Sequence, residues 1–186
     1  MNIPGIIDPK HDDRSVVDLL FFPTGGGKTE AYLGLSAFTL VLRRLRNRGL
    51  SAAGVSVLMR YTLRMLTLDQ LGRAAALICA LEMERKKDIE RLGKWPFEIG
   101  LWVGLGATPN RMGEKGDNNP DSARAKTIAY KNGTRRESPI PLEECPWCGK
   151  PFTKDSFSLA PPQDRPTDLL IRCVDRACDF SRNNFL

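Results

Sequence analysis

Two groups of residues in this sequence have the types and the spacing to do chemistry. The first is FFPTGGGKTE, residues 21–30, in which three glycines lead into a lysine and a threonine. Phosphate-binding loops of the form G-x-x-x-x-G-K-[ST] lie between a strand and a helix. Gly27, Lys28 and Thr29 match the end of this pattern, whereas Phe22 stands where the first glycine is expected.

The chemistry that this loop predicts is the binding of ATP with Mg²⁺. Glycines permit the unusual dihedral angles that let backbone N–H groups wrap a phosphate, and the start of the next helix adds a positive dipole. Lys28 would contact the β- and γ-phosphates and the Thr29 hydroxyl would bind Mg²⁺, so these two are the candidate catalytic residues. A glycine-rich turn with a chance lysine is the alternative. The candidate ATP-binding residues are Thr24, Gly25, Gly26, Gly27, Lys28, Thr29 and Glu30.

The second group consists of four cysteines in two close pairs. Cys145 and Cys148 lie in C-P-W-C-G, and Cys173 and Cys178 follow after 24 intervening residues with C-x₄-C spacing. Four thiolates in two pairs suit tetrahedral Zn²⁺, and a closed Cys₄ set leaves no open coordination position, so we predict a structural zinc. Four unrelated thiols are the alternative. Cys79 lies among alanines and leucines and is predicted to be a small buried residue.

The elements that must position these groups follow from the hydrophobic pattern. Apolar runs at residues 16–22, 55–59 and 99–103 predict strands buried on both faces. Apolar residues at helical spacing follow each of the first two runs, at residues 31–45 and 68–81. This βαβαβ order predicts an α/β fold with an open parallel sheet.

Length and composition limit the class of protein. The chain has 186 residues, of which 41% are hydrophobic and 27% charged, as expected of one globular domain with a small appendage. The net charge of +6 favours a polyanionic partner such as nucleic acid. We expect Arg43, Arg44, Arg46 and Arg48 to complement a helix dipole and face water. No membrane span or signal peptide is expected, which predicts a cytoplasmic protein in which zinc is favoured over disulfides.

The composition changes along the chain, which predicts three regions. Residues 1–110 should form the nucleotide-binding lobe. Residues 111–141 contain few apolar residues and should form a mobile basic linker. Residues 142–186 should form a zinc-binding unit, because a unit this small needs a metal or another cross-link to fold.

The motifs together resemble a known family. PTGGGKT resembles motif I of superfamily 2 helicases, VLMRYTLRMLTLDQ resembles their motif Ia, and WVG with ATPNR is similar to the region of motif Ib. Together with CPWCG, they resemble the large helicase component of DISARM-type anti-phage systems, which carries a zinc-binding insertion in the first helicase lobe. The resemblance covers nearly the whole chain.

This resemblance implies a partial RecA-like P-loop domain with a small zinc-ribbon-like unit. It implies an ATP-dependent helicase or translocase that acts on nucleic acid, with DNA favoured over RNA, and that works with other defence-system subunits. The residues that would contact nucleic acid are Arg60, Tyr61, Thr62, Arg64, Gly104, Thr108 and Arg111. From spacing alone, the segment around Tyr61 could equally be a helix start that packs on the sheet, with its arginines in water.

The sequence lacks the apolar strand ending in D-E that ATP hydrolysis needs, and it lacks a second lobe. We therefore expect an N-terminal fragment that is inactive by itself. Two other classes remain open: a zinc-ribbon nucleic-acid-binding module with a vestigial P-loop, and a P-loop small-molecule kinase.

Overall fold

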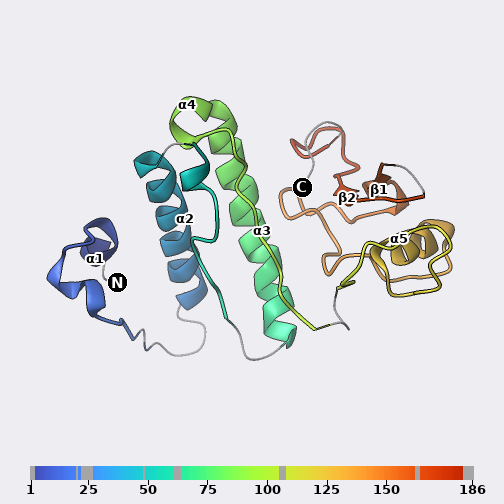
Figure 1. Ribbon diagram of the computed structural model, residues 1–186, viewed down its shortest axis with the longest axis horizontal. Helices are drawn as coiled ribbons and strands as arrows, with labels where there is room; N and C mark the ends of the chain where they lie inside the picture. Colours follow the sequence, from blue (N-terminus) through green and yellow to red (C-terminus); the bar gives the residue numbers. More distant parts are fainter. Residues whose placement is uncertain are drawn as a thin grey trace. The chain divides into compact units, whose positions relative to one another are not determined.

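The computed structural model describes residues 3–19, 21, 27–47, 49–60, 64–104, 108–161 and 164–181, without the side chains of 64–67. The α-helices are α1 (Ile3–Ile7), α2 (Lys28–Arg46), α3 (Arg64–Lys87), α4 (Ile89–Leu92) and α5 (Ala123–Asn132) (Figure 1). Short 3-10 helices span Asp12–Ser15, Gly49–Ala52 and Lys154–Ser156, and the strands are β1 (Phe157–Ala160) and β2 (Asp168–Ile171).

The chain divides into two compact units. The first unit contains Met1–Tyr61 and Ala80–Glu98, and the second contains Thr62–Cys79 and Ile99–Leu186. In the part of the chain that is described, none of the helices has the length and apolar character needed to span a bilayer.

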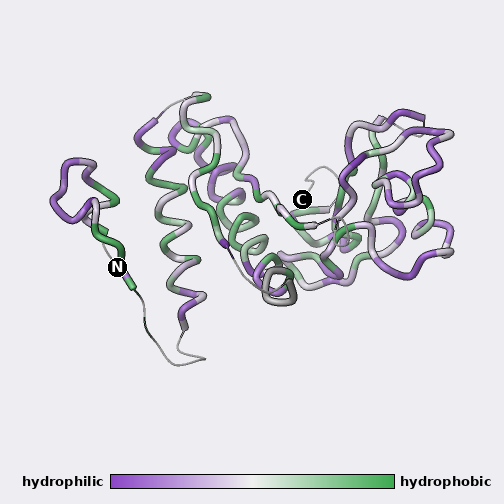
Figure 2. Tube along the Cα trace, turned by 60° about the horizontal axis from the view of Figure 1, so that its bottom comes forward, coloured by the Kyte–Doolittle hydropathy of each residue, from purple (hydrophilic) through white to green (hydrophobic). Residues whose placement is uncertain are grey.

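The helix predicted after the glycines is confirmed as α2. Gly27 precedes it in the left-handed conformation, with φ 73°, which glycine adopts without steric cost. At the other end, the N–H of Asn47 donates to the carbonyl of Arg43 at 3.0 Å. Hydrophobic and hydrophilic residues alternate along the helix (Figure 2), as the spacing of the apolar residues predicts.

The arginines at the end of α2 are not all solvated, so that expectation is wrong for two of them. Arg43 donates to the carbonyl oxygens of Ala53, at 2.6 Å, and Val55, at 3.0 Å. Arg44 is only 7% exposed, donates to the carbonyl of Pro96 at 2.9 Å and lies 5.0 Å from the centre of the Phe97 ring. The two arginines therefore donate hydrogen bonds to backbone carbonyls at residues 53–55 and at Pro96, which need partners where water is excluded.

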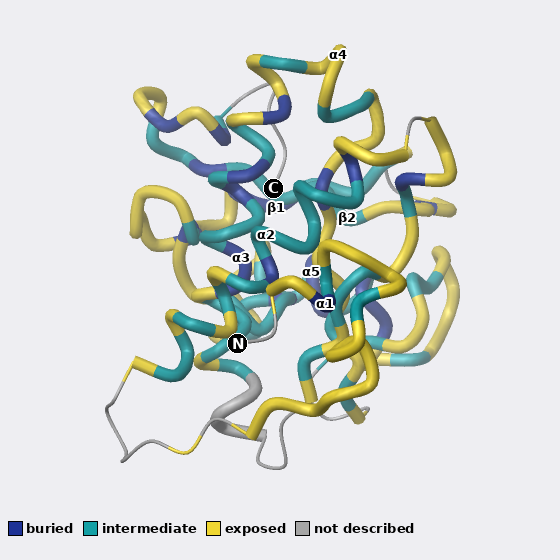
Figure 3. Tube along the Cα trace, turned by 90° about the vertical axis from the view of Figure 1, so that its left-hand side faces the viewer, coloured by how far each residue is buried: buried dark blue, intermediate teal, exposed yellow. Residues whose placement is uncertain are grey.

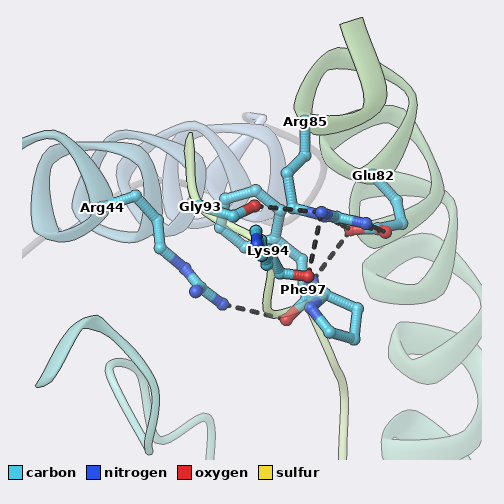
Figure 4. A network of polar contacts seen from close by, with 7 residues as sticks. Arg44, Glu82, Arg85, Gly93, Lys94 and Phe97 are labelled. Carbon is cyan, nitrogen blue, oxygen red and sulfur yellow. Dashed lines mark hydrogen bonds and ion pairs between the residues drawn. The ribbon is translucent and has the colours of Figure 1, made fainter. Parts of the chain in front are cut away.

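A second part of this network joins α3 to the segment that follows α4 (Figure 4). Nε and Nη2 of Arg85 donate to the carboxylate oxygens of Glu82. The third nitrogen, Nη1, donates to the carbonyls of Gly93 at 3.0 Å and Lys94 at 3.1 Å. The N–H of Phe97 donates to Glu82 at 2.9 Å. Burial opposes ionisation of Glu82, but the hydrogen bonds from Arg85 and Phe97 outweigh it and hold the pKa of this carboxyl below its usual value.

The predicted parallel sheet is absent from the described residues. Their only sheet is the antiparallel pair of β1 and β2, in register from Phe157 opposite Ile171 to Ala160 opposite Asp168. The described residues of the three apolar runs, at 16–19, 21, 55–59 and 99–103, form no strand.

The exposure of their apolar side chains shows that the three runs are not the buried strands that the sequence predicts. Val17 and Leu19 are 90% and 89% exposed, Leu58 is 86% exposed and Trp102 is fully exposed. Exposed segments such as these appear in yellow in Figure 3. A buried parallel strand needs hydrogen-bonded neighbours and a covering layer on both faces, and the described residues supply neither to these runs.

The second unit contains a helix in the segment that the sequence predicted to be a mobile linker. The Ser122 hydroxyl accepts the Ala125 N–H at 3.2 Å at the start of α5, and Gly133 ends the helix in the left-handed conformation. Gly113, with φ 81°, lies directly against this cap. A Cβ at Gly113 would lie 2.5 Å from the Cβ and Oγ atoms of Ser122.

An aromatic cluster connects α5 to β1. Phe157 is fully buried, and the rings of Tyr130 and Phe152 each lie 5.6 Å from it in edge-on arrangements. Lys131 donates from Nζ to the Phe157 carbonyl at 2.9 Å. These contacts give the second unit an apolar centre beside the cysteines.

Candidate functional site

Each cysteine pair is placed by a tight turn. The N–H of Cys145 donates to the Lys150 carbonyl at 2.9 Å, and the N–H of Gly149 donates back to the Cys145 carbonyl at 2.8 Å. We call residues 145–149 the first knuckle. In the second knuckle, residues 173–178, the N–H of Cys178 donates to the Asp175 carbonyl at 3.1 Å.

The two knuckles bring the four predicted ligands together. The four sulfur atoms lie within 4.8 Å of one another, with 3.9 Å between Cys145 and Cys178 and 3.5 Å between Cys148 and Cys173. A tetrahedron with Zn–S bonds of about 2.3 Å has sulfur atoms about 3.8 Å apart. The spacing therefore fits one zinc ion, and the sequence prediction that these four cysteines form one cluster is confirmed.

Hydrogen bonds and burial act in opposite directions on the ionisation of the sulfurs. Backbone N–H groups of Asp175 and Phe180 donate to the sulfurs of Cys173, at 3.4 Å, and Cys178, at 3.5 Å. Burial nevertheless raises the pKa of Cys173 to about 11 and also raises the pKa of Cys178. Burial acts in the same direction on Cys148, but hydrogen bonds from Lys150 and the neighbouring thiols lower its pKa overall. A divalent cation would hold all four groups as thiolates.

The sequence analysis missed a contact between the first knuckle and the two residues that directly follow the second knuckle. The indole N–H of Trp147 donates to the Asp179 carboxylate at 3.0 Å, and its ring lies edge-on to Phe180 at 5.9 Å. The tryptophan is visible within C-P-W-C-G, but its partners lie more than 30 residues away in sequence. Cys79, by contrast, is buried in α3 as predicted and is not part of the cluster.

The phosphate-loop candidates are described only in part. Gly27 precedes α2, and Lys28, Thr29 and Glu30 form its first turn, with the Ala31 N–H donating to the Gly27 carbonyl at 3.2 Å. Thr24, Gly25 and Gly26 lie outside the described residues. The described part therefore has the turn-to-helix order that a phosphate loop requires.

The nucleic-acid candidates belong to both units. Arg60 is exposed and lies in the first unit, whereas Arg64 is the first residue of α3 and lies in the second. Gly104, Thr108 and Arg111 are also in the second unit, and the carbonyl of Arg111 accepts the N–H of Ala123 at 2.9 Å. Tyr61 and Thr62 lie outside the described residues.

Comparison with known proteins gives one informative relative. No protein-family model matches the chain. The chain is 38% identical, over 192 aligned residues, to the DISARM protein DrmA of Bacillus paralicheniformis, with 99% of this chain and 16% of DrmA covered. The chain thus spans about a sixth of the length of this curated relative. The glycine-rich stretch and the four cysteines both fall in the aligned part, so the chain is similar over nearly its whole length to one part of a DISARM component.

Proposed function

We propose that this chain is the ATP-binding and zinc-binding part of a helicase or translocase component of a DISARM-type defence system in the cytoplasm. The single observation that carries the proposal is the 38% identity to DrmA across nearly the whole chain. Nucleic acid, with DNA favoured over RNA, and other subunits of the defence system are the proposed partners.

In this function, the start of α2 binds the nucleotide. Lys28 would contact the β- and γ-phosphates, the Thr29 hydroxyl would hold Mg²⁺, and the Gly27 turn would direct backbone N–H groups at the phosphates. The left-handed Gly27 and the position of Lys28 as the first residue of α2 support this assignment.

The three exposed apolar runs become strands of a RecA-like sheet in a larger protein that contains this sequence. Val17, Leu19 and Phe21 alternate along their segment and are each about nine-tenths exposed, which leaves a row of apolar side chains without cover. Neighbouring strands and helices from elsewhere in such a protein would bury them.

The zinc has a structural role in this proposal. Four sulfurs complete a tetrahedral site, so no position remains for substrate or water. The ion would link the two knuckles, and the free energy of zinc binding would stabilise the folded second unit.

Calorimetric titration with ATP and Mg²⁺ tests the nucleotide site. Lys28→Ala should lower the affinity at least about tenfold, because it removes the charge nearest the phosphates. Lys10→Ala, which removes an equal charge from an exposed position, is the control and should bind like the wild type. Equal affinity for the wild type and Lys28→Ala would refute the role of Lys28.

Two further measurements separate the alternatives. A protein of DrmA's length that carries this sequence should hydrolyse ATP faster with DNA present, whereas a small-molecule kinase would respond to small acceptors. The cysteine cluster favours the zinc-ribbon module as second candidate. That module would bind DNA with no measurable affinity for ATP.

A further inference from the structure

The amino-terminal half of α3 and the segment that leads into the first knuckle line one groove. Leu68, Gly72 and Ala76 are four residues apart, so they lie on one face of α3. A groove of about 370 Å³ separates this face from the first knuckle and the residues before it. Its lining includes Pro141, Leu142, Pro146 and Gly149 on the knuckle side.

Leu142 approaches this helical face at Gly72. A Cβ at Gly72 would lie 4.0 Å from the Cδ2 atom of Leu142, so the glycine leaves space that the leucine approaches. Both residues belong to the second unit. Ala75 and Cys79 are buried on the same helix, so this half of α3 is packed.

The first knuckle fixes the position of Leu142. The Phe152 N–H donates to the Glu143 carbonyl at 2.9 Å, and Glu144 pairs with Pro151 in an antiparallel bridge. These bonds close the turn that contains Cys145 and Cys148, and Leu142 is the residue just before it. Zinc binding to the cysteines would hold this turn closed.

We propose that Leu142 is a positioning residue that makes nucleic-acid binding depend on zinc. The metal-bound knuckle holds Leu142, and Leu142 holds the amino-terminal half of α3, which begins at Arg64. The resemblance to helicases implies that Arg64 contacts nucleic acid, and the proposed function takes nucleic acid as a partner, so this inference rests on that function. The leucine touches neither metal nor nucleic acid in this role.

Hydrogen exchange of the full 186-residue, zinc-loaded chain tests the inference directly. Leu142→Ser should raise the exchange rates of amides 68–79 by about tenfold or more and leave those of amides 80–87 unchanged, with one zinc still bound. Leu142→Met keeps the apolar contact and should restore wild-type exchange. Cys148→Ser should lose the zinc and increase exchange over the same residues as Leu142→Ser.

Titration of single-stranded DNA by fluorescence anisotropy completes the test. Leu142→Ser should bind more weakly than both the wild type and Leu142→Met. Unchanged exchange of amides 68–79 in zinc-loaded Leu142→Ser would overturn the inference, and so would unchanged DNA affinity. If the wild type binds no DNA, the proposed function fails, whereas the exchange data still decide whether Leu142 positions α3.

A second variant tests the same contact from the side of α3, in case Leu142→Ser loses its zinc. Gly72→Glu places a charged side chain against Leu142 from the helix side. Because Cys145 lines the same groove, the zinc content of this variant is measured together with its exchange. The variant should increase exchange of amides 68–79 with zinc retained. Wild-type exchange in this variant would contradict the proposed contact.

Discussion

Replacing Glu82 should destabilise the first unit far more than replacing Glu84, although both form the same kind of ion pair. Each glutamate pairs with a basic residue three positions later in α3, at 2.6 Å. The side chains of Glu82 and Arg85 are only 12% and 9% exposed, whereas those of Glu84 and Lys87 are 63% and 66% exposed. The two pairs therefore differ in burial, and Glu82 also accepts the Phe97 N–H.

The expected magnitudes follow from that difference. Glu82→Ala leaves the buried guanidinium of Arg85 without its carboxylate, which costs about 3–5 kcal/mol. Glu84→Ala removes an exposed pair, which costs about 0–1 kcal/mol. The variants should therefore differ by about 3 kcal/mol in the free energy of unfolding.

Hydrogen exchange of α2 amides across a urea series measures this free energy for the first unit separately. The same measurement at low pH gives a second check. The pKa of Glu82 is lowered in the folded state, so its contribution is fully present above the ordinary glutamate value of 4.5 and is lost as pH falls through the folded value. The gap between the wild type and Glu82→Gln should therefore close in acid.

A gap of less than about 1 kcal/mol between Glu82→Ala and Glu84→Ala at neutral pH would refute this reasoning. It would mean that water reaches Arg85 once the carboxylate is removed. A gap between the wild type and Glu82→Gln that stays constant down to pH 3 would contradict the lowered pKa.

Three further predictions concern the second unit and nucleic acid. Elemental analysis should find one zinc per chain, lost on serine replacement of any one of Cys145, Cys148, Cys173 and Cys178, and retained in Cys79→Ser. Binding of single-stranded DNA, followed by anisotropy, should weaken steeply with salt and depend little on base sequence, and salt-independent binding would contradict contact with phosphates. Gly113→Ala should destabilise the second unit by more than about 2 kcal/mol in a denaturant titration, because it combines a positive φ with a steric clash at Ser122. Gly116→Ala, with φ 89° and open space around it, should cost only about 1 kcal/mol, and equal losses would show that the clash does not matter.

The sequence was most informative where its signal is local or chemical. The spacing of apolar residues predicted α2 and α3, because helical contacts join residues three and four apart. Cysteine spacing predicted the cluster, because few other roles need two close thiol pairs.

The sequence was least informative where residues distant along the chain must meet. The parallel strands were predicted from apolar runs, but pairing depends on neighbours that the runs do not encode. Arg44 was expected in water, since a basic residue at a helix end gives no sign that the carbonyl of Pro96 lies beside it. α5 was missed because its segment is polar, although Ser122 and Gly133 are ordinary helix-capping residues.

The contact that Trp147 makes across the two knuckles gives the protein its own optical signal. Its indole is held between the Asp179 carboxylate and the edge of the Phe180 ring. If the second knuckle moved away, both neighbours would leave together, and the indole, which is now 39% exposed, would become more fully hydrated. Trp102 is already fully exposed, and the Trp95 indole N–H donates to Glu98 at 3.2 Å, so neither should report on the cysteines. The emission spectrum of the unlabelled protein should therefore shift to the red as metal leaves, which allows the rate of release to be followed in real time.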